Sequence, residues 1–100
     1  MGATKLSIYP RTQIRKSDIA RAVSTPARIS ILKTILSDGK TDGLYLLDIL
    51  KLSQPTIHHH LTVLKNTGLI KGDFFGEGYY WFLNSECAEE IESLKWFLED

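Results

Sequence analysis

The chain has 100 residues, and its twelve lysines and arginines are balanced by twelve aspartates and glutamates, so it carries no formal net charge. This length suits a single domain, and the lone Cys87 excludes a secreted scaffold held together by internal disulfides. No apolar run approaches the roughly 18 residues of a membrane span, so we expect a cytoplasmic protein, in or near the nucleoid.

The neutral total hides an uneven distribution of charge. Residues 1–83 hold eleven lysines and arginines against six acidic residues, a net charge of +5, whereas residues 84–100 hold one against six, a net charge of −5. The pI of about 6.8 argues against a simple polycation. A basic body with an acidic segment directed elsewhere nevertheless fits a nucleic-acid-binding protein of modest non-specific affinity.

The N-terminal region is basic and only weakly patterned. Its basic residues are Lys5, Arg11, Arg15 and Lys16. We expect residues 1–16 to form a partly flexible arm, followed by a short helix at about residues 18–23.

The clearest helical signal follows at residues 26–38. Thr25 is a good N-cap, and Pro26 is tolerated in the first turn, where its missing N–H costs nothing. Apolar side chains recur at helical spacing, at Ile29, Leu32 and Leu36, flanked by Ile31 and Ile35. The pair Asp38-Gly39 ends the run.

Two helices joined by a short turn come next. The apolar run at residues 44–50 predicts a short helix at about 45–50, followed by a turn at residues 51–52. Ser53 is an N-cap for a further helix that extends to about Asn66, and Gly68 follows as its left-handed C-terminal residue. The apolar stripe of this helix consists of Ile57, Leu61 and Leu64.

After residue 69 the period changes, and two β-prone runs flank the three-residue turn Gly76-Glu77-Gly78, which predicts a hairpin. Asn84-Ser85 then caps a last helix at residues 86–98. This helix has a narrow apolar seam and an aromatic pair, Trp96 and Phe97, that a monomer does not need to bury. We expect a homodimer interface formed by Cys87, Ile91, Leu94, Phe97 and Leu98.

This order of elements predicts a mainly α fold with a small β-hairpin, an α+β winged helix-turn-helix. We expect three parts: a basic arm at residues 1–16, a winged helix-turn-helix DNA-binding domain at residues 17–83, and a dimerisation helix at residues 84–100.

In such a fold the second helix of the motif enters the major groove of DNA. With its apolar stripe held inward, the outward side chains are Gln54, Thr56 and His59, with His58 and Lys65 beside them. Glutamine can bond adenine bidentately, threonine can reach a base edge or a thymine methyl, and lysine can meet phosphate.

Two segments carry a family resemblance. SQPTIHHHLTVLKNTGLI at residues 53–70 resembles the recognition-helix signature of ArsR-type winged-helix repressors, and TPARISIL at residues 25–32 is similar to the first long helix of that family. The resemblance covers about residues 18–83 and implies a homodimeric, sequence-specific DNA-binding transcription regulator. The positions that it places against the bases are Gln54, Thr56, His58 and His59. We expect contacts to the DNA backbone from Arg28, Ser53, Lys65 and Lys71.

The sequence departs from the family at three places. Metal-sensing members carry cysteines in the first helix of the motif, where this chain has Leu46, Leu47 and Asp48. Other members carry histidine and acidic ligands on the last helix, which has no histidine here, so we expect no metal and no cofactor. The wing of the family is usually rich in arginine, whereas residues 71–78 hold one base and two acids. This difference argues against strong contact between the wing tip and DNA.

Three features have a second interpretation. The consecutive histidines at residues 58–60 point about 100° apart on a helix and do not converge on one metal ion, so we expect His60 to pack sideways. The aromatic run at residues 79–82 is either a stacking platform for single-stranded nucleic acid or, as strand alternation favours, packing. Cys87 is either a redox sensor or, as its apolar seam favours, inert packing.

We therefore predict a sequence-specific DNA-binding transcription regulator, a repressor, whose partners are double-stranded DNA and a second copy of itself. The alternative is a winged-helix module that docks a protein through Trp96, Phe97 and the aromatic wing without binding DNA, and the acidic wing favours it. We do not expect an enzyme, because no nucleophile, base and orienting group occur at a catalytic spacing.

Overall fold

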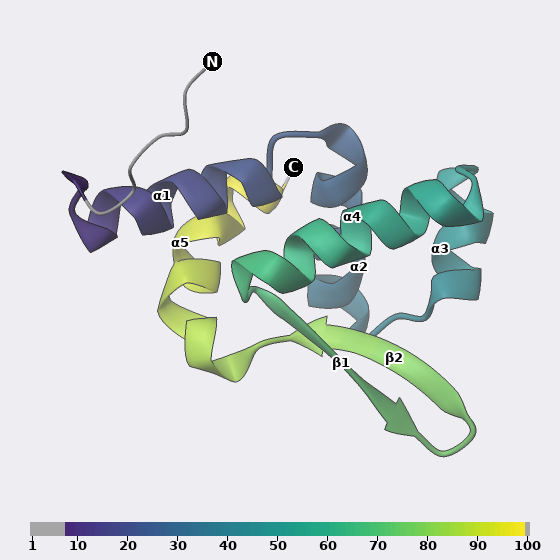
Figure 1. Cartoon of the computed structure of the whole chain (residues 1–100). Helices are drawn as coiled ribbons and strands as arrows, with labels where there is room; N and C mark the ends of the chain where they lie inside the picture. The colour runs from purple at the N-terminus through teal and green to yellow at the C-terminus, as the bar shows by residue number, and fades with distance from the viewer. Residues whose placement is uncertain (1–7, 100) are drawn as a thin grey trace.

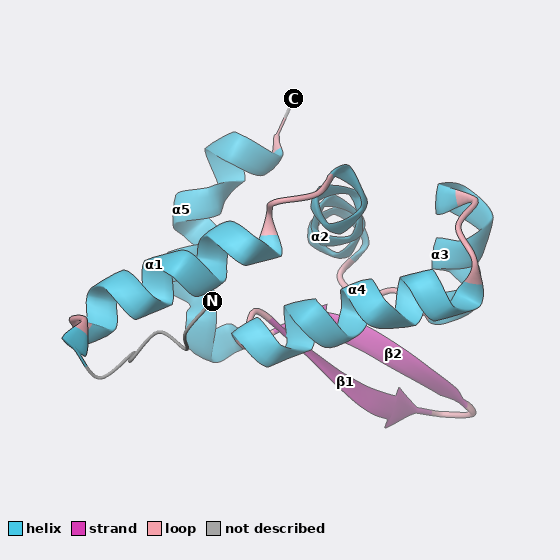
Figure 2. Cartoon of the chain, turned by 45° about the horizontal axis from the view of Figure 1, so that its top comes forward, coloured by secondary structure: helices cyan, strands magenta, loops and turns pink. Residues whose placement is uncertain are grey.

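The computed structural model describes residues 8–99, and this part of the chain forms five α-helices and one β-hairpin (Figures 1 and 2). In chain order the elements are α1 (Arg11–Ala22), α2 (Pro26–Asp38), α3 (Gly43–Leu50), α4 (Gln54–Thr67), β1 (Ile70–Phe75), β2 (Gly78–Leu83), the 3₁₀ turn η2 (Ser85–Cys87) and α5 (Ala88–Leu98). The predicted fold class, mainly helical with a small antiparallel hairpin, is confirmed. None of the described helices combines the length and the hydropathy needed to cross a bilayer.

Side-chain caps set the helix boundaries, as the sequence predicts. The Thr25 hydroxyl accepts a hydrogen bond from the Arg28 N–H at 3.2 Å, and the Ser53 hydroxyl accepts one from the Thr56 N–H at 3.3 Å. Gly68 ends α4 with a φ of +85°, a left-handed conformation that favours glycine. Helix α3 begins at Gly43, about two residues earlier than predicted, because the Asp42 carboxylate caps it by accepting from the Tyr45 N–H at 2.7 Å.

The N-terminal prediction is wrong for residues 11–16, which belong to α1 and not to a flexible arm. The Pro10 carbonyl accepts from the Gln13 and Ile14 N–H groups and starts the helix seven residues before the expected position, Asp18. Helix α1 lies beside α4, and Ala22 near its end is fully buried. The remainder of the predicted arm, including Lys5, lies largely outside the described residues, which begin at Ile8.

The hydrophobic core lies between α2, α4 and the base of the hairpin. The side chains that are almost completely buried are Ile31, Leu32, Ile35, Leu46, Leu64, Leu69 and Ile70. Helix α5 packs against this core through Ile91 and Leu98, which are 8% and 3% exposed.

Helix α5, with its N-cap Cys87, carries the residues of the predicted dimer interface, and two of them are buried within their own chain. Ile91 and Leu98 are core residues of their own chain, and Cys87 and Leu94 are half-buried against the same core. Ile91 and Leu98 therefore anchor α5 to the chain, whereas Cys87 and Leu94 keep part of their surface exposed. Of the predicted interface, Phe97 remains 41% exposed, beside Trp96 at 77%.

The hairpin forms the wing, which projects beyond the helices in both views (Figures 1 and 2). Its antiparallel register runs from the pair Ile70–Leu83 to the pair Phe75–Gly78, so the turn has two residues, Gly76 and Glu77, and not the three predicted. Gly76 has a φ of +59°, which fits the first position of a type II′ turn.

A backbone bridge ties the wing to the loop before α3. The Thr41 N–H donates to the Trp81 carbonyl at 3.0 Å, and the Trp81 N–H donates to the Thr41 carbonyl at 2.8 Å. Strand β2 is thus paired on both sides at Trp81, which fixes the base of the wing relative to the helix-turn-helix.

Candidate nucleic-acid interface

Helices α3 and α4 are joined by a tight turn in which Lys51 adopts a left-handed conformation, with φ 57° and ψ 33°. A non-glycine residue with positive φ is uncommon, and Lys51 is the only one in the described part of the chain. The conformation ends α3 at Leu50 and allows the chain to reverse before Ser53 starts α4. The two helices lie against each other, so the predicted helix-turn-helix is present.

Helix α4 has one buried and one exposed face. Ile57, Leu61 and Leu64 are at most 4% exposed, as predicted. The opposite face presents polar side chains to solvent: Gln54, His58, His59, Thr62, Lys65 and Asn66. Thr62 and Asn66 were not among the predicted site residues, although their spacing of four from His58 places them on its face. The exposed polar surface of α4 therefore extends over two full helical turns and is available for contact with DNA.

Ser53 and Thr56 lie at the start of this face and bond to each other. Their hydroxyl oxygens are 2.8 Å apart, and the Ser53 hydroxyl also accepts from the Thr56 N–H. Thr56 is half-buried, whereas Ser53 is exposed. A contact of Ser53 with DNA must therefore share the oxygen that caps the helix, and a contact of the Thr56 hydroxyl must share the group that bonds Ser53.

Arg28 does not lie where a phosphate contact requires it. Its side chain is buried, at 6% exposure, and its three nitrogens are used within the chain. Nε donates to the Arg21 carbonyl at 3.1 Å, Nη1 donates to His60 Nδ1 at 2.9 Å, and Nη2 donates to the Ser24 hydroxyl at 2.8 Å. The structure corrects the prediction of a DNA contact: Arg28 joins the end of α1, the start of α2 and the middle of α4.

His60 packs sideways against Arg28, as expected. Because arginine is always a donor, His60 Nδ1 must accept, which leaves the proton of the neutral ring on Nε2. Burial, and secondly the Arg28 charge, lower the pKa of His60 below its ordinary value. In the described part of the chain no three His, Cys, Asp or Glu side chains gather in a way that would hold a metal ion.

The wing presents aromatic and acidic side chains more than basic ones. Lys71 is exposed on β1, but Asp73 and Glu77 nearer the tip are exposed as well. Phe74 and Phe75 are 71% and 48% exposed.

The aromatic run of β2 divides between two faces, as strand alternation predicts. Tyr79 contacts Trp81 edge to face at 5.4 Å, on the face that looks toward the helices, and Trp81 packs against the core. Tyr80 and Phe82 contact Phe75 on the other face. Packing therefore accounts for most of the run.

A second group of contacts holds the C-terminal end of α4. Arg15 of α1 donates to the Thr67 carbonyl and to the Glu90 carboxylate of α5. Asn84 Nδ2 donates to the Gly68 carbonyl at 2.9 Å, and the Cys87 thiol donates to the same oxygen at 3.2 Å. Burial raises the pKa of Cys87, with the Glu90 hydrogen bond as the next cause, so the thiol stays protonated, which favours packing over redox chemistry. The hydrogen bond from Arg15 lowers the pKa of Glu90.

The exposed side of α5 lies far from the helix-turn-helix. Figures 1 and 2 show α5 and α3 at opposite ends of the molecule. Trp96 and Phe97 contact each other edge to face at 5.7 Å. The segment formed by η2 and α5 holds four glutamates and one lysine, so it is net negative, and it lies away from the polar face of α4.

Comparison with known proteins identifies the family. Residues 25–71 match the model of the bacterial regulatory proteins of the arsR family. The chain is 32% identical, over 80 residues, to an uncharacterized HTH-type transcriptional regulator of Methanocaldococcus jannaschii, a match that covers 80% of this chain and 90% of that protein. It is 29% identical to the transcriptional repressor SdpR of Bacillus subtilis over 82% of this chain and 88% of that protein.

A solved structure of HlyU from Vibrio cholerae has the same fold, with a TM-score of 0.72 and 22% identity over 89% of this chain and 97% of that one. The family match includes both segments on which the resemblance rests, residues 25–32 and 53–70. The relatives are transcriptional regulators and not enzymes. The chain belongs to the ArsR family of winged helix-turn-helix transcriptional regulators.

Proposed function

We propose that the chain is a sequence-specific DNA-binding repressor that acts as a homodimer and inserts α4 into the major groove. The observation that carries this proposal is the continuous polar face of α4, which is exposed while the opposite stripe anchors the helix in the core. The similarity to SdpR, a transcriptional repressor, supports repression over activation. Such a protein acts at the nucleoid, in the cytoplasm.

The base contacts come from Gln54, Thr56, His58 and His59, and the backbone contacts come from Ser53, Lys65 and Lys71. Gln54, His58 and His59 are exposed, whereas the half-buried Thr56 reaches DNA only through its methyl group or its shared hydroxyl. Arg28 is not part of this set, because it is buried and bonded within the chain.

The test of base readout compares a selected cognate duplex with a random duplex. Gln54→Ala and His59→Ala are expected to weaken cognate binding by about 1–3 kcal/mol each and to leave random duplex nearly unchanged, because they remove base contacts. Lys65→Ala should weaken both duplexes alike and reduce the slope of affinity against salt by about one unit. Equal losses on both duplexes for Gln54→Ala would refute base readout by α4.

The homodimer is formed through the exposed side of α5 and the neighbouring α1. Trp96 is 77% exposed and Phe97 41%, which is more apolar surface than a short terminal helix normally leaves in water. Two recognition helices related by two-fold symmetry read half-sites about 34 Å apart, so the operator is palindromic. Trp96→Glu is expected to give a monomer in light scattering, whereas Ile49→Glu, a matched change on α3, should leave the dimer intact. A dimer that persists in Trp96→Glu would contradict this interface.

A protein-docking function without DNA is the second candidate. It is favoured by the exposed Phe74 beside the acidic Asp73 and Glu77, which suit a basic partner better than a phosphate backbone. Titration of mixed duplex DNA at two salt concentrations separates the two functions. Absence of salt-dependent binding at micromolar protein would favour docking and refute the DNA proposal.

A further inference from the structure

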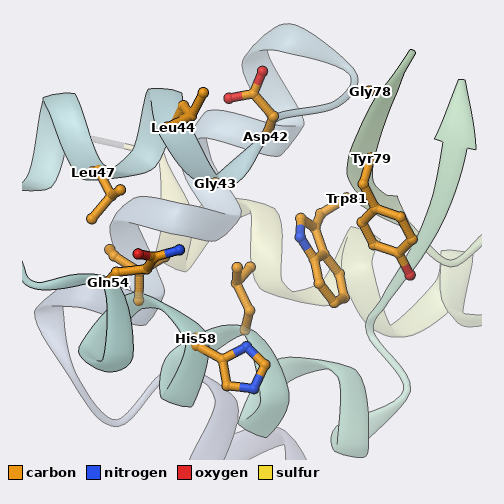
Figure 3. Close-up of a pocket in the computed structure, with 11 residues that line it drawn as sticks. Asp42, Gly43, Leu44, Leu47, Gln54, His58, Gly78, Tyr79 and Trp81 are labelled. Carbon is orange, nitrogen blue, oxygen red and sulfur yellow. The ribbon is translucent and has the colours of Figure 1, made fainter. Parts of the chain in front are cut away.

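A cleft of about 380 Å³ opens between the start of α3, the first turns of α4 and the wing (Figure 3). In the close-up, Leu44 and Leu47 of α3 form one side, and Tyr79 and Trp81 of β2 form the other. The floor comes from α4. This volume lies in the range of small-molecule sites, and an aliphatic wall opposite an aromatic wall suits a flat, largely apolar molecule.

The aromatic wall is held in place before any ligand arrives. The Tyr79 ring contacts the Phe74 ring edge to face at 4.8 Å, and Trp81 is fixed by its backbone bridge to Thr41. Gly72 makes room for Tyr79, because a Cβ atom at this position would lie 2.6 Å from the tyrosine ring. A rigid wall of this kind lowers the entropy cost of binding.

The charge of the cleft does not suit a phosphate. Of the described residues that line it, none is a lysine or arginine, and Asp42 is the only acidic one. The Tyr45 N–H donates a hydrogen bond to the Asp42 carboxylate at 2.7 Å and thereby orients it. The Asp42 carboxylate stands at the rim of the cleft and is turned away from the aromatic rings (Figure 3), and from there it attracts a cation or an N–H donor and repels an anion.

The cleft also carries apolar surface that the chain leaves in water. Leu44 is 79% exposed and Tyr79 is 39% exposed, and both stand at the cleft. Gln54 and His58, at the other margin, supply hydrogen-bonding groups (Figure 3). A molecule between these walls covers the apolar side chains and contacts the polar ones.

We propose that this cleft binds a small planar aromatic amine, and that the bound amine releases DNA. The second part rests on the proposed function: Gln54 and His58 line the cleft and are also proposed base contacts, so a ligand against them competes directly with the major groove. The ligand is positively charged, its ring lies between Leu44 and Tyr79, and its ammonium group pairs with Asp42.

The first test follows the two indole N–H signals of the isotope-labelled chain by NMR, without DNA. The probe is naphthylmethylamine, with naphthylmethanol and naphthoate as its neutral and anionic counterparts. The amine is expected to shift the Trp81 signal and not that of Trp96, and to bind about fivefold more tightly than the alcohol, with naphthoate weakest. Equal shifts of both indoles, or no preference for the amine, would overturn the site.

Two variants and a matched control test the residues. Asp42→Asn keeps a side chain that caps helices but removes the charge, so the amine should bind no better than the alcohol. Leu44→Lys places a cation at the mouth and should weaken amine binding about tenfold. Ile49→Lys adds the same charge on α3 outside the cleft and should change little, with the helical circular dichroism of all three unchanged. If Ile49→Lys weakens binding as much as Leu44→Lys, the effect is general electrostatics and the site is refuted.

The final test adds duplex DNA and separates this inference from the proposed function. Naphthylmethylamine is expected to lower duplex affinity of the unaltered protein but not of Leu44→Lys, after correction for its own binding to DNA. If the amine shifts Trp81 and duplex affinity is unchanged, the release of DNA is overturned. If the protein binds no duplex at all, the proposed function fails, while the Trp81 titration still supports or refutes the cleft.

Discussion

Replacement of Arg28 by alanine is expected to destabilise the fold, not to remove a DNA contact. The guanidinium is buried and donates to the Arg21 carbonyl, the Ser24 hydroxyl and His60 Nδ1 at 2.8–3.1 Å. Each bond from a charged donor to a protein acceptor contributes about 1.5 kcal/mol or more, and truncation leaves the acceptors unpaired. Allowing for repair by water, we expect a loss of about 3 kcal/mol in the free energy of unfolding. For a chain of this size that lowers Tm by roughly 12–20 °C.

The assay is urea unfolding followed by circular dichroism, at one fixed protein concentration because a dimer makes stability concentration-dependent. Arg28→Lys keeps the charge but not the three-way fork and should lose nearly as much stability. Arg21→Ala removes a neighbouring, largely exposed side chain while keeping the carbonyl that Arg28 uses, and should cost less than about 0.5 kcal/mol. A loss below about 1 kcal/mol in Arg28→Ala, together with equally weakened binding to all duplexes, would refute the structural role and restore the phosphate contact.

Two further predictions follow from the same contacts. The pKa of His60 is lowered in the fold, so the unfolded chain binds the extra proton first: stability should fall as pH drops below about 6.5, the ordinary histidine value, and level off below the lowered pKa. Urea midpoints between pH 8 and pH 5 check this, and a His60→Gln variant with the same pH slope would exclude His60 as the source. Gly72→Ala should displace the Tyr79 ring and change the near-ultraviolet circular dichroism at little cost in stability, because the end of a partly exposed side chain can move, whereas Gly43→Ala, where a Cβ meets nothing within 4 Å, should change neither. An unchanged aromatic spectrum in Gly72→Ala would show that the wing does not hold Tyr79 as described.

Local signals in the sequence were sufficient for the centre of the fold. The bounds of α4 are predicted to within one residue, because its N-cap Ser53, its apolar stripe and its C-terminal Gly68 are all local sequence signals. The start of α1 was missed, since Pro10 supplies a backbone carbonyl and no side-chain cap. Its helix is stabilised by distant partners such as Thr67 and Glu90, which no local window contains.

The site could be predicted only in part, for the same physical reason. Periodicity identified the exposed face of α4, but a pattern of spacing does not reveal that Arg28 lies under His60. The seam of α5 was recognised as apolar, yet periodicity does not distinguish a stripe that faces its own core from one that faces a partner. The cleft beside Trp81 depends on the angle between the wing and α3, and that angle is fixed by the backbone bridge at Thr41, where the sequence shows no motif.

The tie at the C-terminal end of α4 has a consequence for the operators that a dimer tolerates. Arg15 of α1, Asn84 and Cys87 all donate to carbonyls at residues 67 and 68, so α4 is clamped by the same segments that adjoin the proposed dimer surface. In a dimer the two recognition helices would then have little freedom to slide or swivel separately. One inserted base pair moves a half-site by about 3.4 Å and turns it by roughly a tenth of a helical turn, a shift that a stiff pair follows only by deforming the duplex. A regulator that acts as proposed would therefore measure the length of the spacer as strictly as it reads the bases.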